Sequence, residues 1–385
     1  MPRNRKVALA LASSVVILTA TTLAAAGDMD ITPERLVTQP AGAMAAAPGG
    51  CQQIAANTAA YQTAAGFPQI AACQPNNVAW ANLMSELGMA IAPSAFHAAR
   101  TTGLGGFALS LEATYTHINN NNSAGGLQYW HVGTQGPTDP NSGKFSTINA
   151  DPDSLLQVYT VKARKGLAYG FEITGALGYI ANTSLWIGGA DFHWALLEGY
   201  RTGFLGYMPD LAVGTGVRTV GGSSKFFLTT VGIDAQVSKP IVLDDSAVLT
   251  PYVGAQYVLI YANSSVVNLA PNADPLAECG YEGTNTPGNP YATQPYNGAP
   301  VCKNKLANGA DNNAAFNNDT TFAKADIKRW RGMVGVNYRF EVLYLAGQFA
   351  MELGDLNGEN GGITGPLGGA GAKQWSTSFE AGVSF

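Results

Sequence analysis

Apolar and polar residues alternate with a period of two through most of the last three-quarters of the chain. Residues 107–116 alternate in this way, and so do 169–179, 227–238, 333–340 and 345–352. Successive side chains of a β-strand point to opposite faces, so the pattern predicts strands with one apolar face. This part of the chain is therefore expected to be all-β and antiparallel.

The length of these strands favours a membrane barrel over a soluble sandwich. Strands of globular proteins usually have about five to six residues, whereas a tilted strand needs about nine to eleven to cross a bilayer. Several predicted strands are longer than about ten residues. The pattern gives about ten crossings, within a range of about eight to twelve: 104–117, 155–165, 168–180, 185–197, 211–220, 226–238, 248–262, 326–340, 343–354 and 373–385.

Aromatic residues gather at the ends of these strands, where the lipid–water interfaces of a barrel lie. They are Tyr115, Tyr169, Tyr179, Trp186, Trp194, Trp330, Tyr338 and Trp375. The lipid-facing set is predicted to include Phe107, Phe171, Phe227, Val334, Phe349 and Phe379. After residue 26 no apolar run reaches about 18 residues. Only helices and closed barrels satisfy every backbone polar group in lipid, so 103–385 should form a closed barrel.

The last strand is apolar on one face up to the final residue. That face consists of Trp375, Thr377, Phe379, Ala381, Val383 and Phe385. The ending resembles the C-terminal strand of bacterial outer-membrane β-barrel proteins, whose terminal aromatic residue is read by the barrel-insertion machinery. The resemblance implies an outer-membrane location and assigns Phe379, Val383 and Phe385 to an insertion signal. It is porin-like in architecture, with OmpW-like and FadL-like barrels as alternatives.

The connections between strands indicate which way the barrel faces. With an even number of strands, the first strand begins and the last strand ends in the periplasm. The turns on that side are short, and the long loops lie on the outer side. The connections 164–168 and 340–343 are tight, whereas 118–154, 263–325 and 355–372 are long and polar. A hairpin hidden in the longest connection would raise the number of strands to about twelve.

The first 26 residues have the anatomy of a secretory signal peptide. Arg3, Arg5 and Lys6 precede an uncharged apolar run, and cleavage is expected after Ala26. An uncleaved anchor helix is the alternative. Removing the peptide leaves 18 Lys and Arg against 26 Asp and Glu, a net charge of about −8. Without a basic patch, nucleic acid is a poor candidate partner.

Residues 27–102 lack the alternation and form a separate N-terminal segment, either periplasmic or plugging the lumen. Between residues 78 and 92, Leu83, Leu87 and Ile91 share one helical face, and Pro93 ends the helix. The short link to the first strand places this helix at the periplasmic mouth. We expect it to narrow or close that end, with a mobile tail as the alternative.

The four cysteines fall into two local pairs. We expect Cys51–Cys73 and Cys279–Cys302 to form disulfides, since each pair closes one loop in an oxidising compartment. Four cysteines allow three pairings in all. Zinc is the alternative, but no CxxC or HxxxH spacing supports a metal site.

Charged residues recur on the inward phase of the strands. They are Glu112, Lys162, Arg164, Glu172, Asp191, His193, Arg218, Asp234, Arg331, Arg339, Glu352 and Glu380. A barrel of eight to ten strands has little free bore. These residues should therefore fill the lumen as pairs, or alternatively form the selectivity lining of a pore.

Catalysis is not expected. Asp191 and His193 lie two apart on one strand and imitate a dyad, but no GxSxG, HExxH or P-loop pattern accompanies them. No cofactor is implied. The predicted function is a small porin-like channel for passive passage of small solutes. The alternatives are a surface-exposed barrel with a filled lumen and a FadL-like transporter of hydrophobic molecules. The expected partners are outer-membrane lipid, the insertion machinery and small solutes.

Overall fold

The computed structural model describes part of the chain. The described residues are 29–33, 36–38, 74–75, 77–94, 98–118, 153–199, 208–244, 246–268, 279–281, 300–302, 319–353 and 374–385. The predicted signal peptide, Cys51 and Cys73 lie outside them. No helix within these ranges is both long and apolar enough to cross a membrane.

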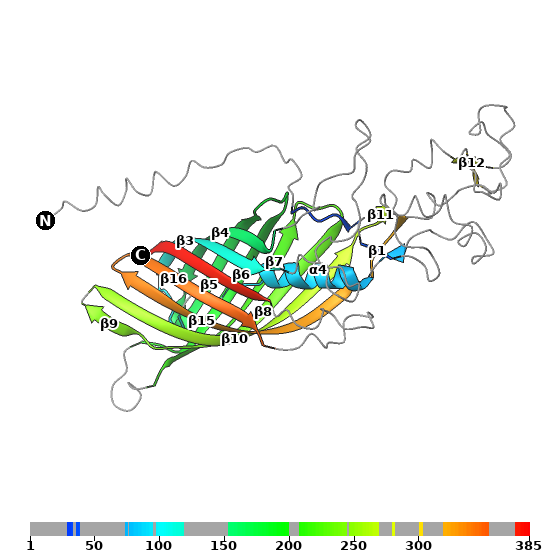
Figure 1. Cartoon of the computed structure of the whole chain (residues 1–385). Coiled ribbons are helices and arrows are strands. Elements are labelled where there is room, and N and C mark those ends of the chain that lie inside the picture. The colour runs from blue at the N-terminus through cyan, green and yellow to red at the C-terminus, as the bar shows by residue number, and fades with distance from the viewer. Residues whose placement is uncertain are drawn as a thin grey trace, which may run out of the picture.

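Ten antiparallel strands close into a barrel (Figure 1). They are β3 (Phe107–His117), β4 (Leu155–Gly166), β5 (Phe171–Ile180), β6 (Trp186–Leu197), β7 (Asp210–Gly221), β8 (Phe226–Ser238), β10 (Ala247–Ser264), β15 (Ala325–Phe340), β16 (Leu343–Glu352) and β17 (Trp375–Ser384). Each strand pairs with the next in this order, and β17 returns to β3. The predicted antiparallel barrel of ten strands is therefore confirmed.

The first and last strands form the seam of the barrel. Their register runs from Ala108 opposite Ser384 to Thr116 opposite Ser376. One step beyond this ladder, the backbones of Phe107 and Phe385 exchange two hydrogen bonds of 3.1 and 2.8 Å. The C-terminal residue thus takes part in closing the ring.

The two ends of the barrel differ. We call the end where β3 begins and β17 stops the terminal end. The opposite end is the connection end, because the long β3–β4, β10–β15 and β16–β17 connections leave from it. Two turns at the terminal end are short, namely that between β4 and β5, which contains the 3₁₀ helix η2 (Ala168–Gly170), and that between β15 and β16.

Short strands lie outside the ring. They are β9 (Ile241–Asp244), which pairs only with β10, and three two-stranded sheets: β1 (Val37–Thr38) with β2 (Gln74–Pro75), β11 (Val267–Asn268) with β14 (Asp319–Thr320), and β12 (Cys279–Tyr281) with β13 (Pro300–Cys302). The hairpin anticipated in the β10–β15 connection corresponds to β12–β13 and does not join the barrel. Cys279 and Cys302 are register partners there, and their disulfide stays a prediction.

The outer face of the barrel is apolar. Phe107, Phe227, Val334, Phe349 and Phe379 are all exposed, with Phe227 at 64% and Phe379 at 57%. Phe171 is half-buried, because its ring contacts Phe192 and Trp194 on the same surface. The predicted lipid-facing set therefore lies on the outside of the barrel. On each strand, the residues that alternate with the outward-facing ones point into the lumen.

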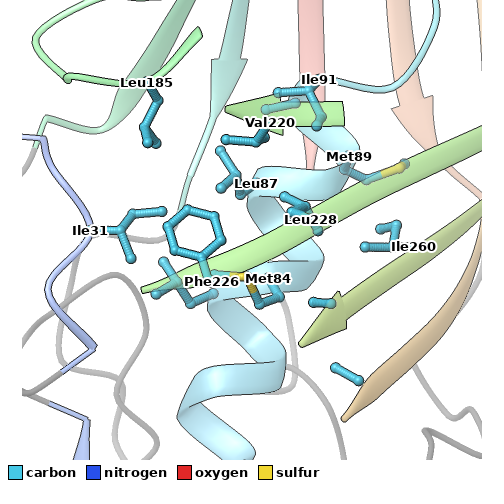
Figure 2. Close-up of a cluster of buried hydrophobic side chains, with 14 of the residues drawn as sticks. Ile31, Met84, Leu87, Met89, Ile91, Leu185, Val220, Phe226, Leu228 and Ile260 are labelled. Carbon is cyan, nitrogen blue, oxygen red and sulfur yellow. The ribbon is translucent and has the colours of Figure 1, made fainter. Parts of the chain in front are cut away.

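Helix α4 (Asn77–Ala90) lies inside the barrel (Figures 1 and 2). Trp80, Leu83, Met84 and Leu87 are fully buried. They share one apolar cluster with strand residues that include Ile180, Val220, Phe226 and Ile260. A helix surrounded by a wall can be apolar on every side, so the single face expected from the sequence is only part of its buried surface.

Within the lumen, the helix lies toward the end opposite to the one expected from its short link to β3. Its wall contacts, such as Ile180 at the end of β5 and Phe226 at the start of β8, belong to the connection end. The terminal end, where the short link to β3 was expected to hold the helix, receives residues 98–106 instead. Helical periodicity predicts a buried face, but it carries no information about which end of a barrel supplies the partners.

Two wall glycines make room for Pro93, three residues beyond the end of the helix. Gly216 and Gly232 are register partners on β7 and β8. A Cβ at Gly216 would lie 2.8 Å from the Pro93 Cβ, and a Cβ at Gly232 would lie 3.4 Å from the Pro93 Cδ. At Gly216 the Asp191 carboxylate lies closer still, so any larger residue would displace both Asp191 and Pro93.

Candidate functional site

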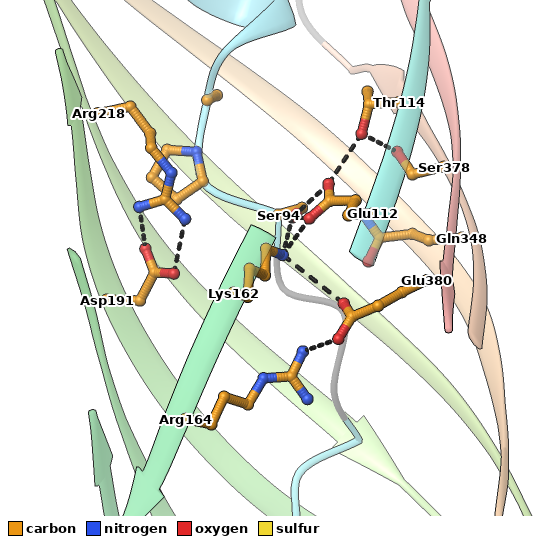
Figure 3. Close-up of polar contacts among 12 residues, drawn as sticks. Ser94, Glu112, Thr114, Lys162, Arg164, Asp191, Arg218, Gln348, Ser378 and Glu380 are labelled. Atoms are coloured by element: carbon orange, nitrogen blue, oxygen red, sulfur yellow. Dashed lines mark hydrogen bonds and ion pairs between the residues drawn. The ribbon is translucent and has the colours of Figure 1, made fainter. Parts of the chain in front are cut away.

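A group of charged side chains crosses the middle of the lumen (Figure 3). Glu112 on β3 and Glu380 on β17 are register partners, and Lys162 on β4 forms ion pairs with both. Arg164 binds Glu380 at 2.5 Å, and the Tyr344 hydroxyl donates to the same carboxylate at 2.7 Å. Two carboxylates facing each other repel, so the two cations are what makes this pairing stable.

The N-terminal segment joins this group through Ser94. The Ser94 hydroxyl donates to the Glu112 carboxylate at 2.9 Å and accepts from Lys162 Nζ at 2.7 Å. On the far side of Glu112, the Thr114 hydroxyl donates to the same carboxylate at 2.8 Å. The residue just beyond Pro93 is therefore fixed by two buried, oppositely charged side chains of the wall.

A second ion pair lies on the opposite wall. Arg218 on β7 binds both carboxylate oxygens of Asp191 on β6, at 2.6 and 2.7 Å. His193 is buried on the same strand. Arg218 thus engages both oxygens of Asp191 in an ion pair.

Arginines of β15 hold the C-terminal half of α4. Arg329 binds Glu352 through two nitrogens, at 2.9 and 2.6 Å, and donates to the backbone carbonyl of Ser85 at 3.0 Å. Arg331 donates to the Pro93 carbonyl at 2.8 Å. Arg331 also donates to the Met89 carbonyl at 3.4 Å. Met89 lies in the last turn of α4, where the helix carries negative partial charge, so a guanidinium group is well suited to this position.

Residues 99–102 are fixed to the wall near the terminal end. The backbone N–H groups of Ala99, Thr101 and Thr102 donate to Ser238, Glu198 and Glu172, at 3.0, 2.9 and 2.8 Å. Arg100 forms an ion pair with Asp210 at 2.6 Å. The backbone N–H groups of the segment are thus bound by side chains of the wall, whereas those of a strand would be bound by the backbone of a neighbouring strand.

Little open space remains beside the segment in the middle of the lumen. Cavities of about 20 and 10 Å³ lie between the end of the helix and the charged group, lined by residues such as Ala92, Glu112 and Gln374. A larger cavity of about 550 Å³ opens between residues 98–102 and the wall, with Arg339 and Tyr344 in its lining. We call this larger cavity the vestibule. It belongs to the terminal end.

The twelve residues predicted to face the lumen do not all lie in the same surroundings. Nine are buried on the inner face: Glu112, Lys162, Arg164, Glu172, His193, Arg218, Arg331, Glu352 and Glu380. Asp191 and Asp234 are partly exposed there, and Arg339 is exposed at the vestibule. Of the predicted insertion signal, Phe379 and Phe385 are exposed on the outside.

Several residues that contact the N-terminal segment were missed in the sequence. Arg329 lies two positions before Arg331 and therefore on the same strand face, which was a usable signal. Gln256 and Gln374, which bind the backbone of Pro93 and Glu86, carry no such signal because neutral amides are common on both faces. In the described residues no group of three or more His, Cys, Asp or Glu could hold a metal ion.

A closed ring of ten antiparallel strands with an apolar outer face and charged residues inside defines a transmembrane β-barrel of the bacterial outer-membrane type. No protein-family model matches the sequence, and no curated protein does.

Comparison with solved structures finds other small barrels, at low similarity. Ail, the attachment invasion locus protein of Yersinia pestis, is 8% identical with a TM-score of 0.22, over 73% of this chain and 99% of Ail. Neisserial surface protein A is 10% identical with a TM-score of 0.23, over 73% and 97%. The outer membrane protease OmpT from Escherichia coli is 9% identical with a TM-score of 0.30, over 73% and 96%.

Proposed function

We propose that this protein is an outer-membrane barrel that is closed at rest and anchors the polar segments of its connection end at the cell surface. The observation that carries the proposal is the occupied lumen. Helix α4 and residues 91–94 and 98–102 fill it and bind the wall through arginine, glutamine and glutamate side chains.

Passive flow needs a continuous water-filled path. A single water needs about 10–15 Å³ of free volume, and the two mid-lumen cavities measure about 20 and 10 Å³. Each of these two cavities therefore has room for single waters and not for a solute. This favours the filled-lumen alternative over an open porin-like channel.

The apolar outer face supports the proposed location. Side chains such as Phe227, Val334 and Phe379 are more than half exposed in the isolated chain. Exposure of so many large apolar groups around a closed barrel is unfavourable in water and favourable in contact with lipid. We assign outer-membrane lipid as the surrounding medium, and the insertion machinery as the partner that reads the exposed Phe385 ring.

A porin-like channel is the second candidate, and the vestibule favours it. The cavity holds about 550 Å³ and its lining combines Arg100, Arg164, Arg339, Glu172 and Glu341. Such a polar mouth suits small hydrophilic solutes better than the hydrophobic molecules of a FadL-like transporter. Passage beyond it requires residues 98–102 and α4 to leave the lumen.

Conductance across planar lipid bilayers tests the proposal. Purified full-length protein should show almost no stable open level, whereas a variant lacking residues 27–98 behind an intact signal peptide should conduct. Heat-modifiable migration in SDS gels controls for an intact barrel in both. A full-length protein that conducts as well as the deletion variant would show that the lumen is not closed at rest.

A further inference from the structure

The contacts of the N-terminal segment follow a single direction through the barrel. Residues 29–33 and 36–38 lie at the connection end. The Met29 N–H donates to the Asn182 carbonyl at 3.0 Å, and the Asp30 carboxylate accepts from the Ser184 N–H at 2.6 Å. Asn182 and Ser184 belong to the β5–β6 turn, which lies at this end.

These residues are packed, not merely adjacent. Leu36 is fully buried, Met29 is 2% exposed, and both belong to the same apolar cluster as Leu83 and Leu87 of α4. Strand β1 pairs with β2, so Gln74 and Pro75, just before the helix, are held on this side as well.

The next contacts lie progressively deeper in the lumen. The Asn77 side chain accepts from the Ala323 N–H at 2.8 Å, and the Trp80 ring stacks on Phe322 with centroids 4.9 Å apart. Ser94 lies at the charged group in the middle. Thr101 and Thr102 reach Glu198 and Glu172 near the terminal end.

The chain leaves the lumen at the terminal end and turns directly into β3. The Gly105 N–H donates to the Gly166 carbonyl at 3.3 Å, and the Gly166 N–H donates to the Gly106 carbonyl at 2.9 Å. Between residues 29 and 106 the described chain therefore passes from one end of the barrel to the other through its interior.

We infer that the barrel holds its own N-terminal segment across the membrane, so that residues 29–33 and 36–38 lie on the same side as the long connections. With the orientation proposed above, that side is the cell surface, and the barrel serves as the export route of a segment of its own chain. The inference rests on the proposed outer-membrane location, and it replaces the periplasmic position expected from the sequence.

The composition of the segment fits passage through a barrel. From Leu36 to Ser85 the sequence has no Asp, Glu, Lys, Arg or His. Moving an unpaired charge through a narrow, partly apolar interior is costly. These fifty consecutive residues avoid that cost, whereas the stretch ahead of them carries Asp28, Asp30, Glu34 and Arg35. Most charges inside the lumen belong to the strands and not to the segment. They bind the backbone and hydroxyl groups of the segment.

Accessibility of epitopes in cells tests the inference. Three variants of the full chain carry an epitope after Thr38, after Asn268 in the β10–β15 connection, or after Glu341 in the β15–β16 turn. We expect antibody to label the Thr38 and Asn268 epitopes on intact cells, and the Glu341 epitope only after permeabilisation. If the Thr38 epitope is labelled under the same conditions as the Glu341 epitope, and not as the Asn268 epitope, the inference is overturned.

The other outcomes separate this inference from the proposed function. If Glu341 is labelled on intact cells and both Thr38 and Asn268 are not, the cell-surface orientation fails while the crossing stands. If the untagged protein is absent from the outer-membrane fraction, the proposed location fails. A fourth variant with the epitope after Asp28 replaces the first if insertion after Thr38 abolishes heat-modifiable migration, and it is judged by the same criteria.

Discussion

At the scale of the residue, strand periodicity predicted the direction of side chains but not their partners. Glu112 and Lys162 were both expected to face inward. They meet because Ser110 is the register partner of Lys162, which brings the next inward residue of β3 beside the amine. Register across a ladder depends on the turn that joins two strands, and the long β3–β4 connection gave no signal for it.

The Arg329–Glu352 pair should be important for stability. Both side chains are at most 3% exposed, and removing one partner of a buried pair leaves an uncompensated charge. We expect Arg329→Met to lower the free energy of unfolding by about 3–5 kcal/mol. Urea titration of the barrel in lipid vesicles, followed by tryptophan fluorescence, measures the change.

Two further variants serve as controls for this prediction. Arg329→Met combined with Glu352→Gln removes both charges, so the double variant should be more stable than Arg329→Met alone. Lys324→Met breaks an exposed pair with Asp326, whose side chains are 58% and 36% exposed, and should cost about 1 kcal/mol or less. Equal losses for Arg329→Met and Lys324→Met would contradict the assigned role.

At the scale of the element, the strands were predictable and the position of the helix was not. A strand such as β17 shows its apolar face in every second residue, and its length alone indicates a crossing. Helix α4 also shows an apolar face, but its partners Phe226 and Ile260 come from distant strands. Which residues surround a lumen segment depends on closure of the ring, and local periodicity carries no such information.

The contact between Gly88 and Ile260 should control whether the lumen is closed. A Cβ at Gly88 would lie 2.5 Å from the Ile260 Cγ2, so Gly88→Leu overpacks the helix against the wall. Overpacking costs about 1–3 kcal/mol, which raises the population of the displaced state by about 5- to 150-fold. Single-channel recording should show correspondingly more frequent opening than in the wild type.

A compensating substitution distinguishes overpacking from general damage. Ile260→Ala removes the contacted atoms, so Gly88→Leu with Ile260→Ala should open less often than Gly88→Leu alone. If Gly88→Leu conducts no more than the wild type while its barrel remains intact in SDS gels, α4 does not close the lumen.

At the scale of the whole molecule, the sequence pattern sufficed for the barrel. Alternation over ten long strands separated it from a sandwich, and the inner and outer faces agree with the structure. The passage of the N-terminal segment through the ring could not be read in the same way. This passage depends on the end at which the chain enters the barrel. That end is set by the topology of the whole fold and is not encoded in any single stretch of residues.

The lipid-facing surface predicts the effect of a charge in its middle. Phe379 lies at the centre of β17 opposite Gly347 of β16 and is 57% exposed. Phe379→Arg should lower the free energy of unfolding by about 2–4 kcal/mol, whereas Leu104→Arg near the terminal end should cost about 0–1 kcal/mol. Urea titration in vesicles compares them, and equal costs would mean that Phe379 does not face the bilayer core.

The face-to-face pair of Glu112 and Glu380 has a consequence for the order of assembly. Their ladder joins the first and last strands of the ring, so it has the greatest sequence separation of the barrel and the largest closure entropy. Pairing of β17 with β3 is opposed by repulsion between the two carboxylates until Lys162 and Arg164 are in place. Strand β4, which carries both cations, should therefore pair with β3 first. Ser94 donates to the Glu112 carboxylate as well, so the N-terminal segment adds one more hydrogen bond at this seam once it lies in the lumen.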